Sequence, residues 1–175
     1  MPMILETPRL ALRELEQKDF KDLAEILQDP QVVYAYDHTF TDDDVQAWLD
    51  RQKKRYETLS FGLWAVVLKS TGQMVGQAGL TMQPYKGKEV LEVGYLLKRE
   101  FWRRGYAREA AQGCKEYAFK VLGHDRVFAI IKADNHPSIE VARSIGMTQR
   151  DRFVTRYYSG DMQHLLFCVD REQDG

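Results

Sequence analysis

One stretch of the chain, residues 94–110 (GYLLKREFWRRGYAREA), constrains the fold more than any other. It begins as an apolar, strand-like run and becomes helix-like immediately after Gly105, with small apolar residues at helical spacing as far as Val121. A run of β-forming residues, RVFAIIK, follows at 126–132. Strand, helix and strand in this order predict a β-α-β crossover near the middle of the chain.

The remaining pattern places further strands and helices around this unit. Thr41 and Asp44 have the spacing of a capping box at a helix start, whereas the segment 31–40 shows no clear period and is expected to be a loop over a site. The order of elements predicts an α+β domain with a mixed, mostly antiparallel central sheet of about seven strands flanked by helices. The other expected strands are 9–15, 61–69, 73–82, 89–97, 149–158 and 162–169. A break at 84–88 (PYKGK) separates the strands 73–82 and 89–97, and a turn at 159–161 (SGD) joins the last two. The other expected helices are 18–27, the segment after Thr41, and 135–146.

Length and composition fit one domain, residues 1–175, that ends in a polar tail at 170–175. The chain is 44% hydrophobic, enough for a core, and its net charge of −1 gives no global field for a polyanion, so we expect no nucleic-acid partner. The longest apolar run, at 61–68, is too short to span a membrane. Cys114 and Cys168 have no metal-ligand neighbours at useful spacing, so buried, reduced thiols and a cytoplasmic location are expected.

The basic residues around Gly105 suggest an anion site. Unpaired N–H groups and the macrodipole make a helix start positive, and a glycine lets a ligand approach the backbone closely. Arg103, Arg104 and Arg108 would add charge suited to phosphate oxygens, so the stretch favours a cradle for a pyrophosphate. The alternative is an ordinary solvated surface. Neither the P-loop pattern nor G-x-G-x-x-G is present, so a P-loop kinase, a GTPase or a dinucleotide fold is not expected.

At this point the sequence resembles a known family. The segments EVGYLLKREFWRRGYAREA (92–110) and NHPSIEVARSIGM (135–147) resemble the GNAT superfamily of acyl-CoA-dependent N-acyltransferases. ETPRLALREL (6–15) and FTDDDVQAWL (40–49) resemble its RimJ/RimL-type branch, the ribosomal-protein N-terminal acetyltransferases. The resemblance covers nearly the whole chain, and the expected element order is the GNAT order. It implies acetyl-CoA as cofactor, CoA as product and no metal.

The resemblance also implies which residues hold the cofactor. The family signature Q/R-x-x-G-x-G/A falls on 102–107, where Trp102 departs from the first position. In GNAT enzymes the amides of this turn hold the CoA pyrophosphate, the preceding strand splays from its parallel neighbour and pairs with pantetheine, and an asparagine contacts the pantetheine arm from the far side. These roles map onto Arg103, Arg104, Gly105, Tyr106, Ala107 and Arg108, onto Tyr95, Leu96 and Leu97, and onto Asn135, with Ser138 near the thioester sulfur.

Three residues are candidates for catalysis. Many GNAT enzymes carry a tyrosine as general acid where this chain has Ala142, and the RimL-like branch offers a serine that maps onto Ser138. Ser138 could instead satisfy N–H groups of its own helix, and Tyr157 could substitute for it or be an ordinary strand residue. Glu92 could accept the amine proton, directly or through water, or be an exposed carboxylate. No Ser-His-Asp or Cys-His pattern is present, so direct attack in a ternary complex is expected.

The amine pocket is expected between the segment 31–40 and the last hairpin. Tyr34, Tyr36, His38 and Trp64 are its candidate lining, although each could equally be a core or surface residue. The expected activity is acetylation of a primary amine, either a protein N-terminus or a small molecule, by a monomer or homodimer with no membrane partner. The alternatives are a catalytically inactive acyl-CoA-binding sensor or partner module and, last, an RNA-binding domain.

Overall fold

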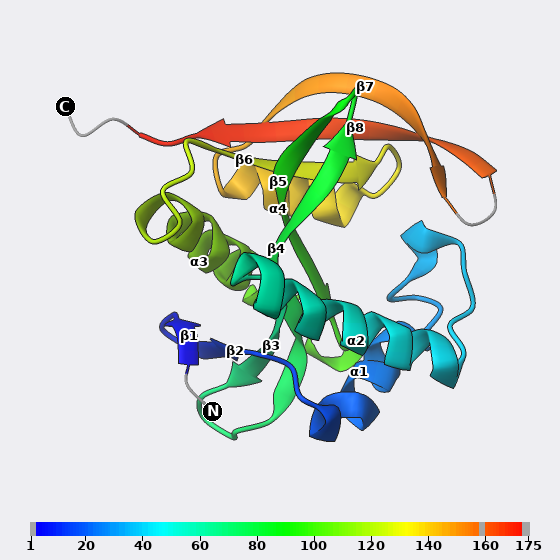
Figure 1. Ribbon diagram of the computed structural model, residues 1–175, viewed down its shortest axis with the longest axis vertical. Helices are drawn as coiled ribbons and strands as arrows, with labels where there is room; N and C mark the ends of the chain where they lie inside the picture. Colours follow the sequence, from blue (N-terminus) through cyan, green and yellow to red (C-terminus); the bar gives the residue numbers. More distant parts are fainter. Residues whose placement is uncertain (1–2, 158–159, 173–175) are drawn as a thin grey trace.

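The computed structural model describes residues 3–157 and 160–172, and only the backbone of Tyr157. It contains one eight-stranded sheet in the order β1-β2-β3-β4-β5-β6-β8-β7, in which only β5 and β6 are parallel (Figure 1). The expected α+β fold with a mixed, mostly antiparallel sheet is confirmed. The strands are β1 (Met3–Glu6), β2 (Leu10–Arg13), β3 (Leu63–Leu68), β4 (Met74–Tyr85), β5 (Lys88–Leu97), β6 (Arg126–Lys132), β7 (Thr148–Tyr157) and β8 (Gly160–Asp170).

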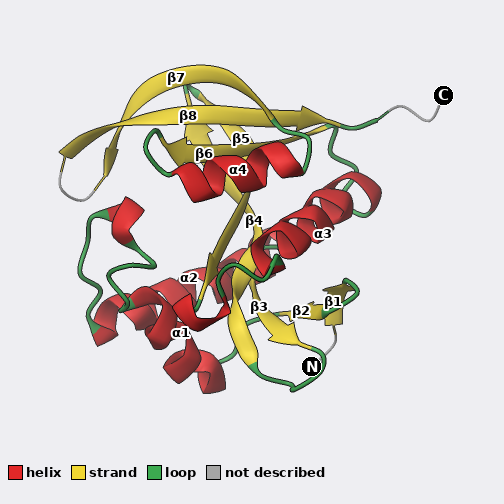
Figure 2. Ribbon diagram, turned by 180° about the vertical axis from the view of Figure 1, so that it is seen from behind, coloured by secondary structure: helices red, strands yellow, loops and turns green. Residues whose placement is uncertain are grey.

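Helices cover both faces of the sheet. Helices α1 and α2 pack on one face of β3 and β4, and α3 and α4 pack on the other face, where α3 makes the crossover between the parallel strands. Figure 2 shows α4 lying against β6–β8 while α1 and α2 lie at the β3 end of the molecule. The helices are α1 (Phe20–Leu27), α2 (Asp42–Leu59), α3 (Tyr106–Lys120) and α4 (His136–Ser144), with short 3₁₀ turns η1 (Gln17–Asp19), η2 (Tyr34–Tyr36) and η3 (Arg99–Phe101).

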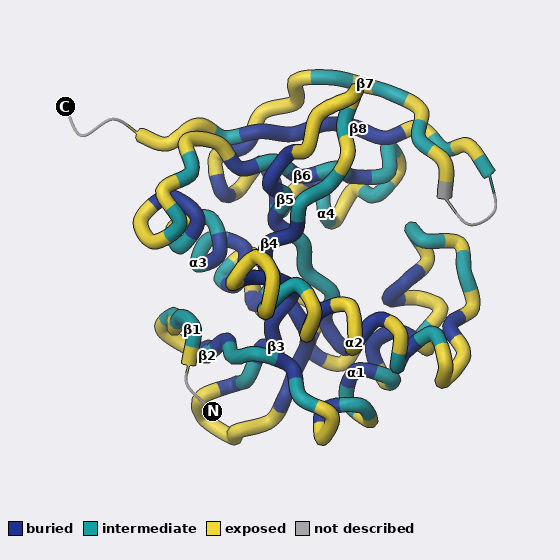
Figure 3. Tube along the Cα trace, in the orientation of Figure 1, coloured by how far each residue is buried: buried dark blue, intermediate teal, exposed yellow. Residues whose placement is uncertain are grey.

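The sequence of β3 is continuously apolar because the strand is buried on both faces. Its side chains alternate between two cores: Leu63 and Ala65 face α1 and α2, whereas Trp64 and Val66 face α3. A strand buried on both faces needs an apolar residue at every position rather than at every second one. Strand β3 and the first eight residues of β4 are accordingly almost continuously buried (Figure 3).

Local signals fixed several element ends. Thr41 Oγ1 accepts a hydrogen bond from Asp44 N at 3.1 Å and Asp44 Oδ2 accepts one from Thr41 N at 2.9 Å, so the expected capping box is confirmed. The expected break at 84–88 is wrong, because β4 and β5 continue to a two-residue turn. Lys86 and Gly87 both have positive φ there (44° and 78°), as in a type I′ turn, whose twist suits a hairpin.

Two further points concern the N-terminal strand and the last hairpin. The four-residue strand β1, which pairs with β2 across a bulge, was not expected and brings the sheet to eight strands. The expected turn at 159–161 between the last two strands lies partly outside the described residues. Where the structure describes this hairpin, Tyr157 pairs with Gly160.

Candidate active site

The turn before α3 is built to receive an anion. Arg103 and Gly105 both have left-handed backbone conformations, with φ of 63° and 80°. The first helical hydrogen bond is that from Glu109 N to Gly105 O at 3.0 Å, so the N–H groups just before it have no partner inside the helix. Alternating left-handed residues and free N–H groups form a concave anion site, to which the helix dipole adds positive potential.

The three arginines around the turn are available for such an anion. Arg103, Arg104 and Arg108 are exposed, and within residues 3–157 and 160–172 none of them forms an ion pair. The guanidinium carbon of Arg104 lies 5.6 Å from the centre of the Phe101 ring. Exposed cations without an ion-pair partner, beside free amides, suit a phosphate-type anion.

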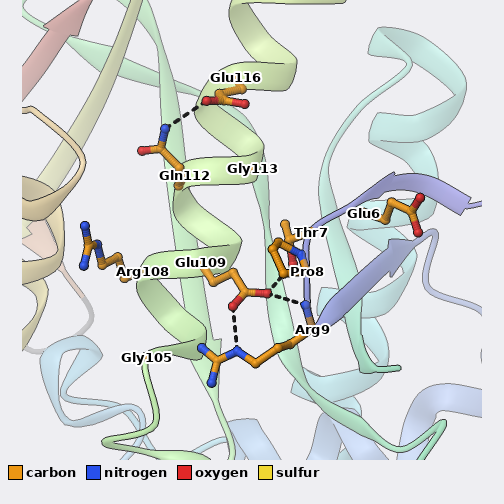
Figure 4. Close-up of a pocket in the computed structure, with 10 residues that line it drawn as sticks. All are labelled: Glu6, Thr7, Pro8, Arg9, Gly105, Arg108, Glu109, Gln112, Gly113 and Glu116. Carbon is orange, nitrogen blue, oxygen red and sulfur yellow. Dashed lines mark hydrogen bonds and ion pairs between the residues drawn. The ribbon is translucent and has the colours of Figure 1, made fainter. Parts of the chain in front are cut away.

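An arginine that the sequence analysis did not single out holds this turn from behind (Figure 4). Arg9 donates from Nη1 to Arg104 O at 2.9 Å and from Nε to Glu109 Oε1 at 2.7 Å, and its guanidinium carbon lies 4.4 Å from the centre of the Tyr106 ring. Thr7 Oγ1 and Arg9 N also donate to Glu109 Oε2. These bonds join the β1–β2 connection to the first turn of α3, at the edge of a groove of about 430 Å³.

Strands β5 and β6 separate next to this turn. Their parallel ladder contains one recorded pair, Glu92 with Phe128. Beyond that pair, the N–H group of Ile130 donates to the side chain of Glu92 (Oε2, 2.6 Å) instead of to a carbonyl of β5. The residues that follow Glu92 on β5 therefore have a free edge toward β6, the kind of edge with which an extended amide chain can pair.

Glu92 lies where the two strands part, and its surroundings change its acidity. Burial raises the pKa of the Glu92 carboxyl from 4.5 to about 7, against the lowering effects of the Ile130 N–H group and of the Arg55 charge. A carboxyl with a pKa near neutrality is an efficient proton acceptor at physiological pH. From the sequence, Glu92 could equally have been an exposed carboxylate at the start of a strand. In the structure Glu92 is only partly exposed.

The start of α4 approaches the same gap from the other face of the sheet. Tyr95 Oη donates to the backbone carbonyl of Ser138 at 3.1 Å, which brings two predicted site residues into contact. Asn135 caps the helix, since its Oδ1 accepts from Ser138 N at 3.3 Å. The Ser138 hydroxyl has no hydrogen-bond partner in the part of the chain that the structure describes, so it is available to a ligand. Ala142 is buried in the core.

The candidate amine-pocket residues do not all come together. Tyr36 and His38 lie in one aromatic group with Phe40, and His38 Nε2 is 3.2 Å from Asp44 Oδ2 of the capping box. Tyr34 is 43% exposed, with Lys132 Nζ 5.7 Å from its ring centre. Trp64, in contrast, is fully buried against Tyr117 of α3, on the opposite face from Tyr36 and away from any surface that a substrate could reach. The side chain of Tyr157 lies outside the described residues.

Cys114 and Cys168 are buried free thiols, as the sequence predicted. Among the described residues, no group of three His, Cys, Asp or Glu side chains is arranged to hold a metal ion. None of the helices that the structure describes is long and apolar enough to cross a membrane.

Comparison with known proteins decides the family. The family model described as an acetyltransferase (GNAT) domain matches residues 9–148. The chain belongs to the GNAT acetyltransferase family. This GNAT enzyme, an acyltransferase, is 33% identical over 144 residues to the uncharacterized protein YkkB of Bacillus subtilis (strain 168), covering 82% of this chain and 84% of the relative. It is 30% identical over 152 residues to the uncharacterized N-acetyltransferase YnaD of the same organism, covering 86% of each chain.

A solved structure shows the same GNAT fold. The acetyltransferase from Agrobacterium tumefaciens str. C58 superposes with a TM-score of 0.81 at 25% identity, covering 98% of this chain and 95% of that one. The GNAT family accounts for the splayed parallel strands and for the glycine turn before α3. It does not by itself name the amine that this enzyme acetylates.

Proposed function

We propose that this GNAT enzyme transfers an acetyl group from acetyl-CoA to a primary amine by direct attack in a ternary complex. The observation that carries the proposal is the carboxyl of Glu92, which lies where β5 and β6 part and has a pKa of about 7. A base poised near neutrality is what an amine nucleophile needs, since the amine must be neutral in order to attack a thioester.

The cofactor would lie along the gap and across the start of α3. Acetyl-CoA, when bound, supplies the activated thioester. The free amides and exposed arginines at 103–108 suit its pyrophosphate, and the free edge of β5 at Tyr95, Leu96 and Leu97 suits the pantetheine amides. Asn135 lies across the gap on the α4 side, with its oxygen used as a helix cap and its NH₂ group left for a ligand.

Proton movements follow from the placement of the polar groups. Glu92 would take a proton from the attacking amine, directly or through one water molecule. A β5 N–H group near Tyr95 or Leu96 would stabilise the developing oxyanion. As the carbon–sulfur bond breaks, the Ser138 hydroxyl would donate a proton to the leaving thiolate and regain one from water, while Glu92 would release the amine proton to water. The Tyr95–Ser138 hydrogen bond fixes the start of α4 against β5. Both cysteines are buried, which supports transfer without an acyl-enzyme.

Solved structures of the same fold support the cofactor assignment. The ribosomal L7/L12 α-N-protein acetyltransferase RimL was solved with CoA (TM-score 0.79, 13% identity) and the spermidine N-acetyltransferase of Vibrio cholerae with CoA and spermine (TM-score 0.75, 14% identity). The first agrees with the RimJ/RimL-type branch that the sequence resembles, and the second is a small-molecule enzyme. At these identities both a protein N-terminus and a metabolite amine remain candidate acceptors.

The proposal is tested by measuring thiol release from acetyl-CoA with a panel of amines, together with CoA binding by calorimetry. We expect saturable CoA binding and release of one thiol for each acetylated amine, identified by mass. CoA binding without turnover on any amine would instead support the inactive acyl-CoA-binding module. No CoA binding would overturn the proposal itself.

A further inference from the structure

An arginine of α2 influences the proposed catalytic carboxyl through its charge rather than through an ion pair. Arg55 is partly buried, and its Nη1 donates to Gln52 Oε1 at 3.1 Å. Nowhere in residues 3–157 and 160–172 does it form an ion pair, yet its charge acts on the carboxyl of Glu92. A partly desolvated guanidinium without a carboxylate partner is unusual, because removing a charge from water is unfavourable unless a counter-charge offsets it.

The packing of α2 places Arg55 on the same side of the sheet as Glu92. A Cβ added at Gly62 would lie 3.3 Å from Arg55 Cβ, so this turn of α2 rests on the start of β3. Gly62 O accepts from Leu80 N at 3.0 Å, and the next residue of β4, Thr81, pairs with Glu92. The Arg55 guanidinium and the Glu92 carboxyl therefore lie on the same face of the sheet, near enough for the charge of Arg55 to lower the pKa of that carboxyl.

Two buried amides add further donors to this face. Gln52 Oε1 accepts from Leu63 N (3.0 Å) and from Arg55, and Gln77 Oε1 accepts from Trp48 Nε1 (3.0 Å), so each amide orientation is fixed by donors. The NH₂ groups of Gln52 and Gln77 then have no acceptor among the described residues, although both residues are 0% exposed. Gln77 pairs with Leu96, which lies on the same face of β5 as Glu92. Buried donors without acceptors are rare and indicate a missing acceptor, such as a water molecule or a ligand oxygen.

From this arrangement we propose that Arg55, with the NH₂ groups of Gln52 and Gln77 beside it, binds a carboxylate of the amine substrate, which is therefore a free α-amino acid or a compact α-amino carboxylate. The inference rests on the proposed acetyl transfer and narrows it. The guanidinium fork and the amide NH₂ groups supply only donors, which match the lone pairs of a carboxylate. Glu92 supplies the acceptor for the amino group, so the two charges of an α-amino acid would meet opposite charges on one face of the sheet.

Other acceptor amines match this set of charged and polar groups less well. A polyamine would place a second cation near Arg55 and leave every donor unpaired. A peptide N-terminus offers a neutral carbonyl where the amino acid has a charged carboxylate, and hydrogen bonds to neutral acceptors are weaker. The charge on the acceptor therefore distinguishes the three classes.

The test compares matched amines on the wild-type enzyme. For a set of L-amino acids, kcat/KM is measured alongside the corresponding amino acid amide and decarboxylated amine, with spermidine and a short peptide included. We expect at least one amino acid to exceed its amide and its amine by on the order of 100-fold, the value of a charge-assisted contact made by an arginine fork. Equal or better rates for the amides, the peptide or spermidine would overturn the inference.

Variants separate the Arg55 contact from general effects. Arg55→Gln should raise KM for the amino acid. It should also lower the ratio of kcat/KM for the amino acid to kcat/KM for the decarboxylated amine to tenfold or less. Arg55→Lys should restore part of this ratio. The matched control is Arg51→Gln, because Arg51 is an exposed arginine one turn earlier in α2. An Arg55→Gln enzyme that folds, binds CoA and keeps the full advantage refutes the role of Arg55. Failure of every amine with intact CoA binding would refute the proposed function instead.

Discussion

The Glu92→Gln variant should lose activity and gain stability at the same time. Glutamine keeps a side-chain oxygen that can accept the hydrogen bond from Ile130 N, so the join between β5 and β6 is retained. It cannot take a proton from the amine. General-base catalysis typically contributes 10²- to 10⁴-fold, so kcat/KM should fall by about that factor.

The stability gain follows from the raised pKa. Folding moves the pKa of this carboxyl from 4.5 to about 7, and each pKa unit corresponds to about 1.4 kcal/mol. The ionised carboxylate therefore destabilises the fold by about 3 kcal/mol above pH 7, as an upper limit because the residue is partly exposed. Because the folded protein holds this proton more tightly than the unfolded chain, the contribution of Glu92 to the free energy of unfolding is highest below pH 4.5. This contribution falls as the pH rises from 4.5 to 7, where the folded protein loses the proton.

The assay is thermal unfolding of both proteins at pH 8 and pH 5, paired with pH–rate profiles. At pH 8 the variant should melt several degrees higher than the wild type, and at pH 5 the difference should largely disappear. Wild-type kcat/KM should fall about tenfold per pH unit below pH 7, and the variant should lack this limb. A variant that keeps wild-type turnover, or that melts lower than the wild type at pH 8, would refute the reasoning.

Three further variants test the cofactor side of the site. Gly105→Ala introduces a side chain at a φ of 80° and 3.2 Å from Arg9 Nη2, and calorimetry should show CoA affinity at least tenfold lower. The control is Gly72→Ala, where φ is a similar 75° and the added Cβ meets no atom within 4 Å. This control should bind CoA with wild-type affinity. Arg9→Gln removes the side-chain bonds to Arg104 O and Glu109 Oε1, so steady-state kinetics should show KM for acetyl-CoA raised several-fold with kcat nearly unchanged. An unchanged KM would mean that the turn keeps its conformation without the Arg9 side chain. Ser138→Ala should slow turnover at least tenfold while CoA affinity changes little, and a wild-type rate would remove the serine from the mechanism.

Much of the fold was readable from local signals in the sequence. The capping box at Thr41, the two-faced apolar run of β3 and the glycine before α3 each act within a few residues, so they leave a recognisable pattern wherever they occur. The break expected at 84–88 failed for a local reason too, since a lysine took a left-handed conformation beside Gly87. Strand β1 escaped notice because four residues are too few to show a period.

The site itself depended on contacts between residues far apart in the chain. The sequence nominated Glu92, but only the separation of β5 and β6 brought its carboxylate to Ile130 N and gave it a pKa near 7. It nominated Trp64 as well, and the register of β3 turned that side chain into the α3 core. No motif or pattern in the sequence had pointed to Arg55.

The amino-acid sequence by itself thus determined the order of helices and strands, the glycine turn and, through them, the family. Tertiary structure alone decided which side chains share a space and how far each is removed from water. The physical reason is that propensity, capping and turn chemistry act over a few bonds, whereas burial, strand register and electrostatic environment are properties of the packed whole.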